Sequence, residues 1–301
     1  VTVSTTVLKN LDLLGNANDL AAFRAFARDT DENHIKFLKD ELKKLFRGNL
    51  LFSCNGPALK KDNLVDQTAR NYDFWISEIG HEYHTQDWFW QVRGISSSNG
   101  KKIMTTSGKL FTVPEFRRII AGNYAVGVNY LVPWDMYLAR IPPEDKNKRL
   151  YSAKEDYADL YGFIRGISGY LDGYEDAFGY GGKDAGVIVD SRTLTDYSGT
   201  PPVKVTVGGD WLYAFTRAKP GNFNAPVVVH LVEWAETPLP STIALDRRFL
   251  FPDKQITVRL LTPELYDERK HADAEAATPK NYASLVNSAD LPITWNGGDE
   301  V

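Results

Sequence analysis

The feature that most constrains the fold is an alternation of helix-like and strand-like segments, which runs from the start to about residue 165. Apolar strands separated by amphipathic helices are typical of a parallel sheet, because parallel strands need long crossover connections. The predicted strands are 50–55, 72–78, 102–107 and 124–132. The predicted helices are 19–46, 85–92, 113–121 and 151–171. This order predicts a (β/α) arrangement of the TIM-barrel type.

The pattern changes after the glycine-rich stretch at Gly179–Gly182. Short apolar runs separated by turn residues predict an antiparallel β-sandwich. These runs are 187–189, 203–207, 211–216, 227–232 and 256–261. We therefore expect two domains: a catalytic (β/α) barrel portion at residues 1–180 and a β-sandwich accessory domain at 181–301. The polar, alanine-rich tail from His271 is expected to pack loosely.

The predicted barrel strands are too few to close a barrel. A (β/α)₈ barrel typically takes about 250 residues, and fewer than 180 precede the sandwich. One explanation is that an N-terminal barrel segment is missing or carried by a second chain, and the other is that further strands lie within Val1–Leu14. We favour the first, so the chain is expected to hold the C-terminal part of a barrel.

Composition narrows the classes of partner. The net charge is −4 and there is no basic tract, which disfavours a nucleic acid, because phosphate binding needs a concentrated Lys/Arg surface. The single cysteine, Cys54, allows no intrachain disulfide. No apolar run approaches the ~18–20 residues of a membrane helix, so no membrane partner is expected. Aromatic residues make up 12% of the chain, which suits a protein that stacks sugar rings.

Three segments carry a resemblance to a known group of enzymes. Phe74–Gly80 and Val128–Leu138 resemble late strands of a glycoside hydrolase barrel, and Ala225–Trp234 resembles the C-terminal sandwich that follows many such barrels. Polysaccharide hydrolases of the agarase or carrageenase kind are the nearest. The resemblance implies hydrolysis of a glycosidic bond, a carbohydrate substrate, no cofactor, and a secreted or periplasmic location.

One feature departs from the pattern of the largest barrel clan, whose retaining enzymes carry their acid/base and nucleophile on the fourth and seventh strands. If 124–132 is the last strand, the seventh strand, 103–107, has no carboxylate and Glu78 sits on the sixth. The standard assignment of the two carboxyl groups therefore does not transfer to this chain.

Two carboxyl residues are the candidates for catalysis, because glycoside hydrolysis needs one protonated and one ionised carboxyl group. Glu78 ends an aromatic strand whose low polarity favours a raised pKa. Its alternative is a strand-end glutamate bonded to a basic neighbour. Asp135 follows Trp134 at a predicted strand end. An aromatic ring and a carboxylate at this position would bind one sugar unit together. Its alternative is a turn or helix-capping aspartate.

The remaining candidates are polar and aromatic residues near the predicted strand ends. The H-x-x-H spacing after Glu78 is compatible with a metal site. Two alternatives are a substrate-binding loop without a metal and a plain surface loop. We favour the substrate-binding loop. Strand-end residues are expected to bond sugar hydroxyls, and aromatic ones to line subsites, although one of the tryptophans after Glu78 is expected in the core. The candidate substrate-binding residues are Asn55, His81, Glu82, His84, Trp88, Ser107, Trp134 and Tyr137.

Two other functions stay open at this point. A sugar-binding protein that has lost one carboxylate would explain the bare strand 103–107. A subunit that completes a split barrel with another chain would explain the small number of barrel strands, because an open sheet edge must be covered.

Overall fold

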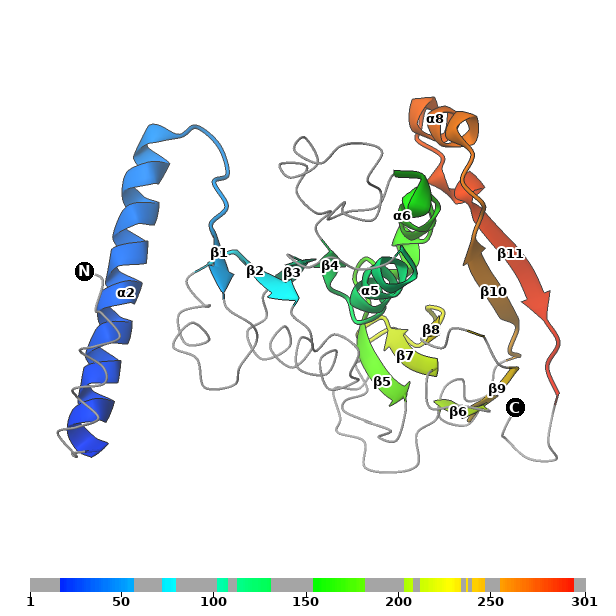
Figure 1. Cartoon of the computed structure of the whole chain (residues 1–301), viewed down its shortest axis with the longest axis horizontal. Coiled ribbons are helices and arrows are strands. Elements are labelled where there is room, and N and C mark those ends of the chain that lie inside the picture. The colour runs from blue at the N-terminus through cyan, green and yellow to red at the C-terminus, as the bar shows by residue number, and fades with distance from the viewer. Residues whose placement is uncertain are drawn as a thin grey trace. The chain divides into compact units, whose positions relative to one another are not determined.

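A computed structural model describes residues 17–56, 72–79, 102–107, 113–130, 154–181, 203–207, 212–233, 237, 240–246 and 255–294 (Figure 1). The chain forms two compact units. The first comprises Val1–Glu78 with Gly94–Thr106, and the second Ile79–Arg93 with Ser107–Val301.

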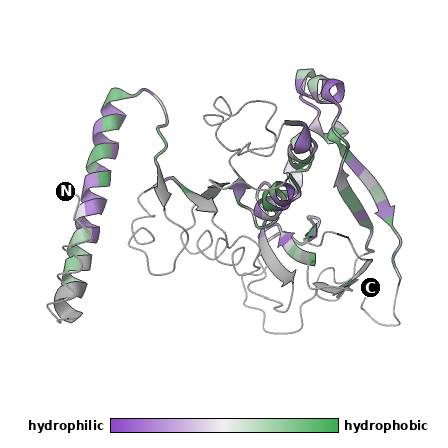
Figure 2. Cartoon of the chain, in the orientation of Figure 1, coloured by the Kyte–Doolittle hydropathy of each residue, from purple (hydrophilic) through white to green (hydrophobic). Residues whose placement is uncertain are grey.

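The first unit contains one long helix and the beginning of a sheet. Helix α2 (Ala17–Leu45) is continuous and ends one residue before the predicted 19–46 segment does, with polar and apolar residues interleaved along it (Figure 2). The strands β1 (Ser53–Gly56), β2 (Phe74–Ile79) and β3 (Lys102–Ser107) are hydrogen-bonded in that order. β1 and β2 are parallel, with Ser53 opposite Phe74. The predicted strand 102–107 is confirmed with its bounds.

Asp73 fixes the start of the β1–β2 pair. Its carboxylate accepts a hydrogen bond from the backbone N–H of Phe52 at 2.8 Å, and its own N–H donates to the Phe52 carbonyl at 2.8 Å. The Lys39 ammonium of α2 lies 3.3 Å from the same carboxylate and 5.1 Å from the centre of the Phe52 ring. α2 is thereby tied to the amino ends of the two strands.

The second unit opens with α5 (Val113–Ala125), which leads into the short strand β4 (Asn129–Tyr130). The predicted strand 124–132 is wrong at its start, because Tyr124 and Ala125 belong to the helix. The buried Asn123 keeps the helix going: its side chain donates to the Ile119 carbonyl at 2.7 Å, and its own carbonyl accepts from the Val128 N–H at 2.8 Å. Gly127, at φ 77°, then turns the chain into β4.

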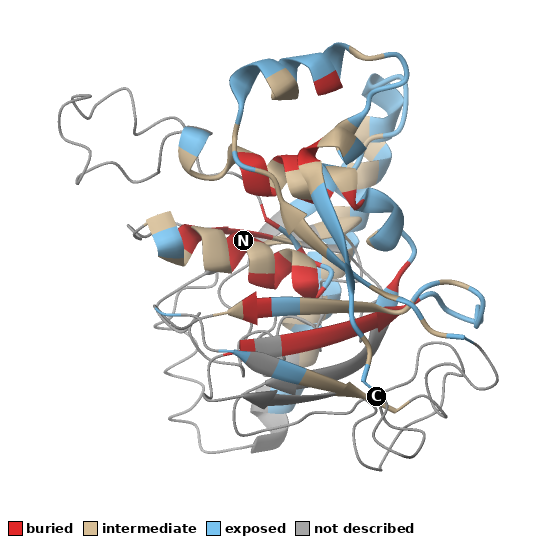
Figure 3. Cartoon of the chain, turned by 90° about the vertical axis from the view of Figure 1, so that its right-hand side faces the viewer, coloured by how far each residue is buried: buried red, intermediate tan, exposed pale blue. Residues whose placement is uncertain are grey.

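The predicted helix 151–171 is split into three pieces: η4 (Lys154–Asp156), α6 (Ala158–Gly166) and η5 (Ser168–Tyr170). Leu160, Ile164 and Ile167 of this segment are all buried. Figure 3 shows that buried residues gather on α5, on α6 and in the sheet beside them. The core of the second unit therefore lies between these helices and the strands that follow.

The strands after α6 form antiparallel sheets. One contains β5 (Glu175–Gly181), β7 (Leu212–Ala218) and β8 (Val228–Glu233) in the order β5-β7-β8. The other pairs β6 (Val203–Val207) with β9 (Ser241–Leu245). Leu212 and Ala214 of the first sheet pack against Val229 of the same sheet and Ile243 of the second. The predicted strand 203–207 is confirmed, and 187–189 lies outside the described residues.

The C-terminal segment packs more tightly than its composition predicts. β10 (Val258–Pro263) pairs antiparallel with β11 (Val286–Leu291), and α8 (Glu268–Ala276) and η6 (Tyr282–Leu285) lie between them in the chain. The Asp267 side chain caps α8 by accepting from the backbone N–H groups of Arg269 and Lys270. Ala274 and Leu285 are buried. The expectation of a loose tail from His271 is therefore wrong, because sparse apolar residues are enough to anchor it.

Candidate functional site

The carboxyl ends of β1 and β2 bring two of the candidate residues to one edge of the sheet. Asn55 in β1 lies opposite Ile76 in β2, and Glu78 follows two residues further along β2. Both residues lie near the carboxyl ends of their strands. Because the pair is parallel, these two ends lie at the same edge of the sheet. In open and closed α/β sheets this is the edge at which ligands bind.

The third strand of this sheet ends in a candidate hydroxyl. Ser107 is the last residue of β3, directly after the buried Thr105 and Thr106. β3 has no carboxylate. The sheet therefore offers one candidate carboxyl residue on its first three strands, Glu78, with an amide residue on β1 and a hydroxyl residue on β3.

The other candidates lie outside the described residues and stay predictions. They are His81, Glu82, His84, Trp88, Trp134, Asp135 and Tyr137. In the part of the chain that the structure describes, no group of three or more His, Cys, Asp or Glu side chains could hold a metal ion. The H-x-x-H spacing itself falls in the segment that is not described.

An ion pair between two helices of the second unit was not found from the sequence. Arg117 of α5 holds Asp159 of α6 in a two-pronged contact, with N–O distances of 2.6 and 2.8 Å, and also donates to the Asp156 carbonyl. The hydrogen bond to Asp159 raises the pKa of Arg117. Arg117 and Asp159 are 42 residues apart in the chain, so no local sequence pattern predicts that they pair. The geometry of the contact fits a structural link between the two helices.

Three tyrosines cluster where α5 meets α6. Tyr161 makes edge-on ring contacts with Tyr124 and Tyr157 at 6.5 and 5.9 Å between ring centres. Its hydroxyl is buried and has no hydrogen-bond partner within the described structure. Burial raises the pKa of Tyr161 above its usual range, so this hydroxyl stays protonated. These edge-on ring contacts pack α5 against α6.

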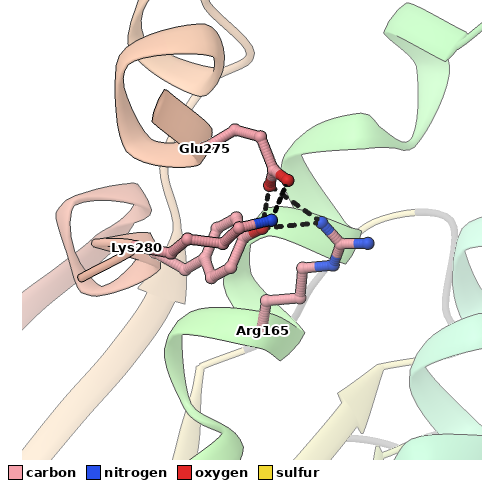
Figure 4. Close-up of polar contacts among 4 residues, drawn as sticks. Arg165, Glu275 and Lys280 are labelled. Atoms are coloured by element: carbon pink, nitrogen blue, oxygen red, sulfur yellow. Dashed lines mark hydrogen bonds and ion pairs between the residues drawn. The ribbon is translucent and has the colours of Figure 1, made fainter. Parts of the chain in front are cut away.

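An exposed polar cluster joins the C-terminal segment to α6 (Figure 4). Arg165 of α6 donates to the Tyr282 hydroxyl at 3.2 Å, stacks 5.1 Å from the centre of its ring, and lies 3.6 Å from Glu275. Glu275 also contacts Lys280 and the Tyr282 hydroxyl. Exposed ion pairs are worth at most about 1 kcal/mol each. The cluster therefore fastens α8 and η6 to α6.

Comparisons with known proteins give no relative. No family model matches the chain, and no match is found among curated proteins or solved structures. Among the described residues, no helix is both long enough and apolar enough to cross a membrane. The functional argument therefore rests on the residues of this chain alone.

Proposed function

We propose that this chain is a glycoside hydrolase that acts on a polysaccharide or oligosaccharide by general acid/base chemistry of carboxyl groups. The observation that carries the proposal is the parallel β1–β2 pair, with Glu78 near the carboxyl end of β2 and Asn55 of β1 opposite Ile76, two residues before Glu78. The fold proposed with it is the C-terminal part of a (β/α) barrel over residues 1–180, followed by a β-sandwich over 181–301.

In this proposal Glu78 and Asp135 are the two catalytic carboxyl residues. Glu78 follows Phe74, Trp75 and Ile76 in β2, an apolar sequence that favours a protonated carboxyl group able to act as the acid. Asp135 supplies the ionised partner from the segment after β4. A separation of about 5 Å between the two groups would favour retention of anomeric configuration, and about 6.5–9.5 Å inversion.

The substrate-binding roles follow the same chemistry. Asn55, Ser107 and the polar loop residues His81, Glu82 and His84 bond sugar hydroxyls, since amides, hydroxyls, imidazoles and carboxylates all match them. The rings that stack on sugar faces are Trp88, Trp134 and Tyr137. A polysaccharide too large to cross a membrane is met outside the cytoplasm, so the proposal extends to a secreted or periplasmic enzyme.

Substitution of Glu78 tests the proposal. We expect Glu78→Gln to lower kcat/KM on agarose or carrageenan, measured by release of reducing ends, by roughly 10²–10⁴-fold, which is the usual contribution of an acid/base group. The matched control is Glu175→Gln, which makes the same change at the exposed first residue of β5. Equal activity of the two variants, with unchanged circular dichroism, would remove Glu78 from the mechanism.

A second candidate function is sugar binding without turnover, in the same fold. The observation that favours it is the absence of a carboxylate from β3 (Lys102–Ser107). Isothermal titration calorimetry with the same polysaccharides separates the two functions. Binding with no release of reducing ends selects the binding protein, and turnover excludes it.

A third candidate is a subunit that completes a split barrel with a second chain. β1 occupies one end of the strand order within the described sheet, and an uncovered edge strand invites pairing. Sedimentation velocity measures this directly. A monomer that retains activity on the polysaccharide would exclude a required partner chain.

A further inference from the structure

Helix α2 turns one face toward its own unit. Half-buried positions recur along this helix at alternating steps of three and four residues, which is the spacing of a single helix face. They are Ala25, Arg28, Glu32, Ile35, Lys39 and Leu42. The ion pair between Lys39 and Asp73 shows that this face points toward the start of the β1–β2 pair. The face about half a turn away therefore points away from those strands.

That outer face carries a second stripe with the same spacing. Phe26, Thr30, Asn33 and Phe37 follow one another at steps of four, three and four residues, and all four are exposed. Phe26 is 68% exposed and Phe37 is 59% exposed. A single exposed aromatic residue is ordinary on a protein surface. Two on one stripe, about 17 Å apart along the axis, with shorter polar residues between them, are the pattern of a seam between helices.

This seam matches itself when a second copy of the helix runs antiparallel. In a pair with two-fold symmetry, a residue that contacts a given position of the other copy is contacted by that same position in return. With the two-fold axis between residues 31 and 32, Phe26 faces Phe37 of the second copy and Thr30 faces Asn33 of the second copy. Each contact then occurs twice. The rings cover each other at both ends of the seam, and the hydroxyl and amide groups meet as donor and acceptor at its middle. A polar pair inside a seam of this kind fixes its register.

The charges beside the seam favour the antiparallel direction. Asp29 and Lys36 each come one residue before a seam position, so they flank the same side of it, and both are exposed. The same two-fold axis brings Asp29 of each copy to Lys36 of the other. Residues 17–31 contain three acidic and two basic residues, and residues 32–45 contain four basic and three acidic ones. An antiparallel pair places these opposite halves side by side and opposes the two helix dipoles, whereas a parallel pair places like beside like.

We propose that the outer face of α2 is a self-association surface on which a second copy of this chain docks antiparallel, with Phe26 against Phe37, to form a symmetric dimer. The next positions outward, Phe23 and Asp40, would face each other and do not match, so the matched seam spans about three helical turns. Such a seam is smaller than a standard interface, and we expect a dissociation constant on the order of 10 µM. The surface lies on the first unit alone. It does not depend on the proposed hydrolysis, and it uses side chains of α2 rather than the edge of β1.

Sedimentation equilibrium of the full chain tests the proposal. Over about 1–300 µM, the average mass of the wild-type protein should rise from one chain toward two. Phe26→Ala and Phe37→Ala each remove a ring that the dimer uses twice, so each should weaken the dimer by at least roughly 100-fold, or tenfold per contact. Phe46→Ala is the matched control, because Phe46 is 56% exposed and lies beyond the end of α2. It should dimerise as the wild-type protein does. A wild-type protein that stays monomeric over this range, or a Phe37→Ala variant that dimerises equally well, would overturn the proposal.

Exchanging the two flanking charges tests the antiparallel direction. Asp29→Lys and Lys36→Asp should each weaken the dimer by roughly tenfold, because two attractive pairs become repulsive. The double variant carries both changes on every chain and restores the attraction, so its dissociation constant should return to within about threefold of the wild-type value. A double variant weaker than either single variant would show that these two residues do not meet across the interface.

Unfolding at low concentration distinguishes a second copy from a cover supplied by the same chain. At about 1 µM the protein is expected to be monomeric, so both phenylalanines should be solvated. Phe26→Ala and Phe37→Ala should then unfold in urea at or slightly above the wild-type midpoint, since alanine is the better helix former. A midpoint clearly below that of the wild-type protein would mean that another part of the same chain covers these rings, and it would contradict the proposal.

Discussion

The contact between α6 and the C-terminal segment depends on glycine at position 166. A Cβ atom at Gly166 would lie 2.6 Å from the backbone carbonyl oxygen of Tyr282, and it would also meet the Cγ2 methyl of Val286. Cβ atoms in folded proteins essentially never approach other atoms within 3.0 Å. Gly166→Ala therefore forces η6 to move by several tenths of an ångström, because a backbone carbonyl cannot rotate away as a side chain can.

Two opposing effects set the change in the free energy of unfolding that Gly166→Ala causes. Alanine is a better helix former than glycine by up to about 1 kcal/mol, and overpacking a well-packed site costs about 1–3 kcal/mol. For Gly166→Ala, at the last residue of α6, we expect a net loss of about 1.5 kcal/mol in the free energy of unfolding. The three atoms nearest to a Cβ at Gly162 all belong to the side chains of His271 and Leu285, which can shift more easily than backbone, so the net effect of Gly162→Ala should be within about 0.5 kcal/mol of zero.

The matched control is Gly169→Ala in η5, where a Cβ atom would meet nothing within 4 Å. Urea unfolding followed by far-UV circular dichroism gives the free energies of unfolding, and hydrogen exchange of residues 282–291 reports whether the local contact has loosened. The expected order of stability places Gly169→Ala and Gly162→Ala close to the wild-type protein and Gly166→Ala clearly below. If Gly166→Ala and Gly169→Ala unfold at the same urea concentration with the same slope, the close-contact argument is wrong.

Two further substitutions test the contacts that hold each unit. Asp73→Ala should lower the free energy of unfolding of the first unit by about 1–2 kcal/mol, because the Phe52 N–H loses a charged acceptor; urea unfolding with exchange of the β1 amides measures this. Asp159→Asn should lower the free energy of unfolding of the second unit by about 2 kcal/mol. The reason is that Arg117 keeps its charge at a half-buried site, whereas residue 159 loses its charge and one of the two oxygens that Arg117 contacts. Thermal unfolding at low and high salt should show the same loss, and a loss that vanishes in 1 M salt would mean that the pair is solvent-screened.

The segments that the sequence predicts well are those in which local periodicity agrees with packing. The bounds of β3 and β6 match their predictions, and α2 fills the predicted helical segment. In each case the run of apolar or amphipathic residues ends at clear turn residues. Local preference and tertiary environment therefore point to the same structure.

The failures occur where tertiary contacts decide. The residues after Ala121 include Gly122 and Asn123, which are poor helix formers, yet the helix continues through them because both are buried and Asn123 bonds to the backbone on either side. The tail from His271 is polar, but it packs because two small glycine surfaces on α6 accept it. Neither effect can be seen in a window of neighbouring residues.

The candidate site is predicted only in part for the same reason. The positions of Asn55 and Glu78 near parallel strand ends follow from counting strands, and the register of β1 and β2 agrees. The pairing of Glu78 with Asp135, which is 57 residues away in the chain, stays a prediction. Residues so far apart meet only through the whole topology, as Arg117 and Asp159 do.

The glycine surface of α6 also sets an order of events during synthesis. Arg165 and Tyr282, which meet in the folded protein, are 117 residues apart in the chain. At a translation rate of 5–20 residues per second, α6 leaves the ribosome roughly 6–24 seconds before its cover is made. Through that interval Gly162 and Gly166 lack their contacts with residues 271–286, so a nascent chain of this protein is expected to need protection of α6 until β11 emerges.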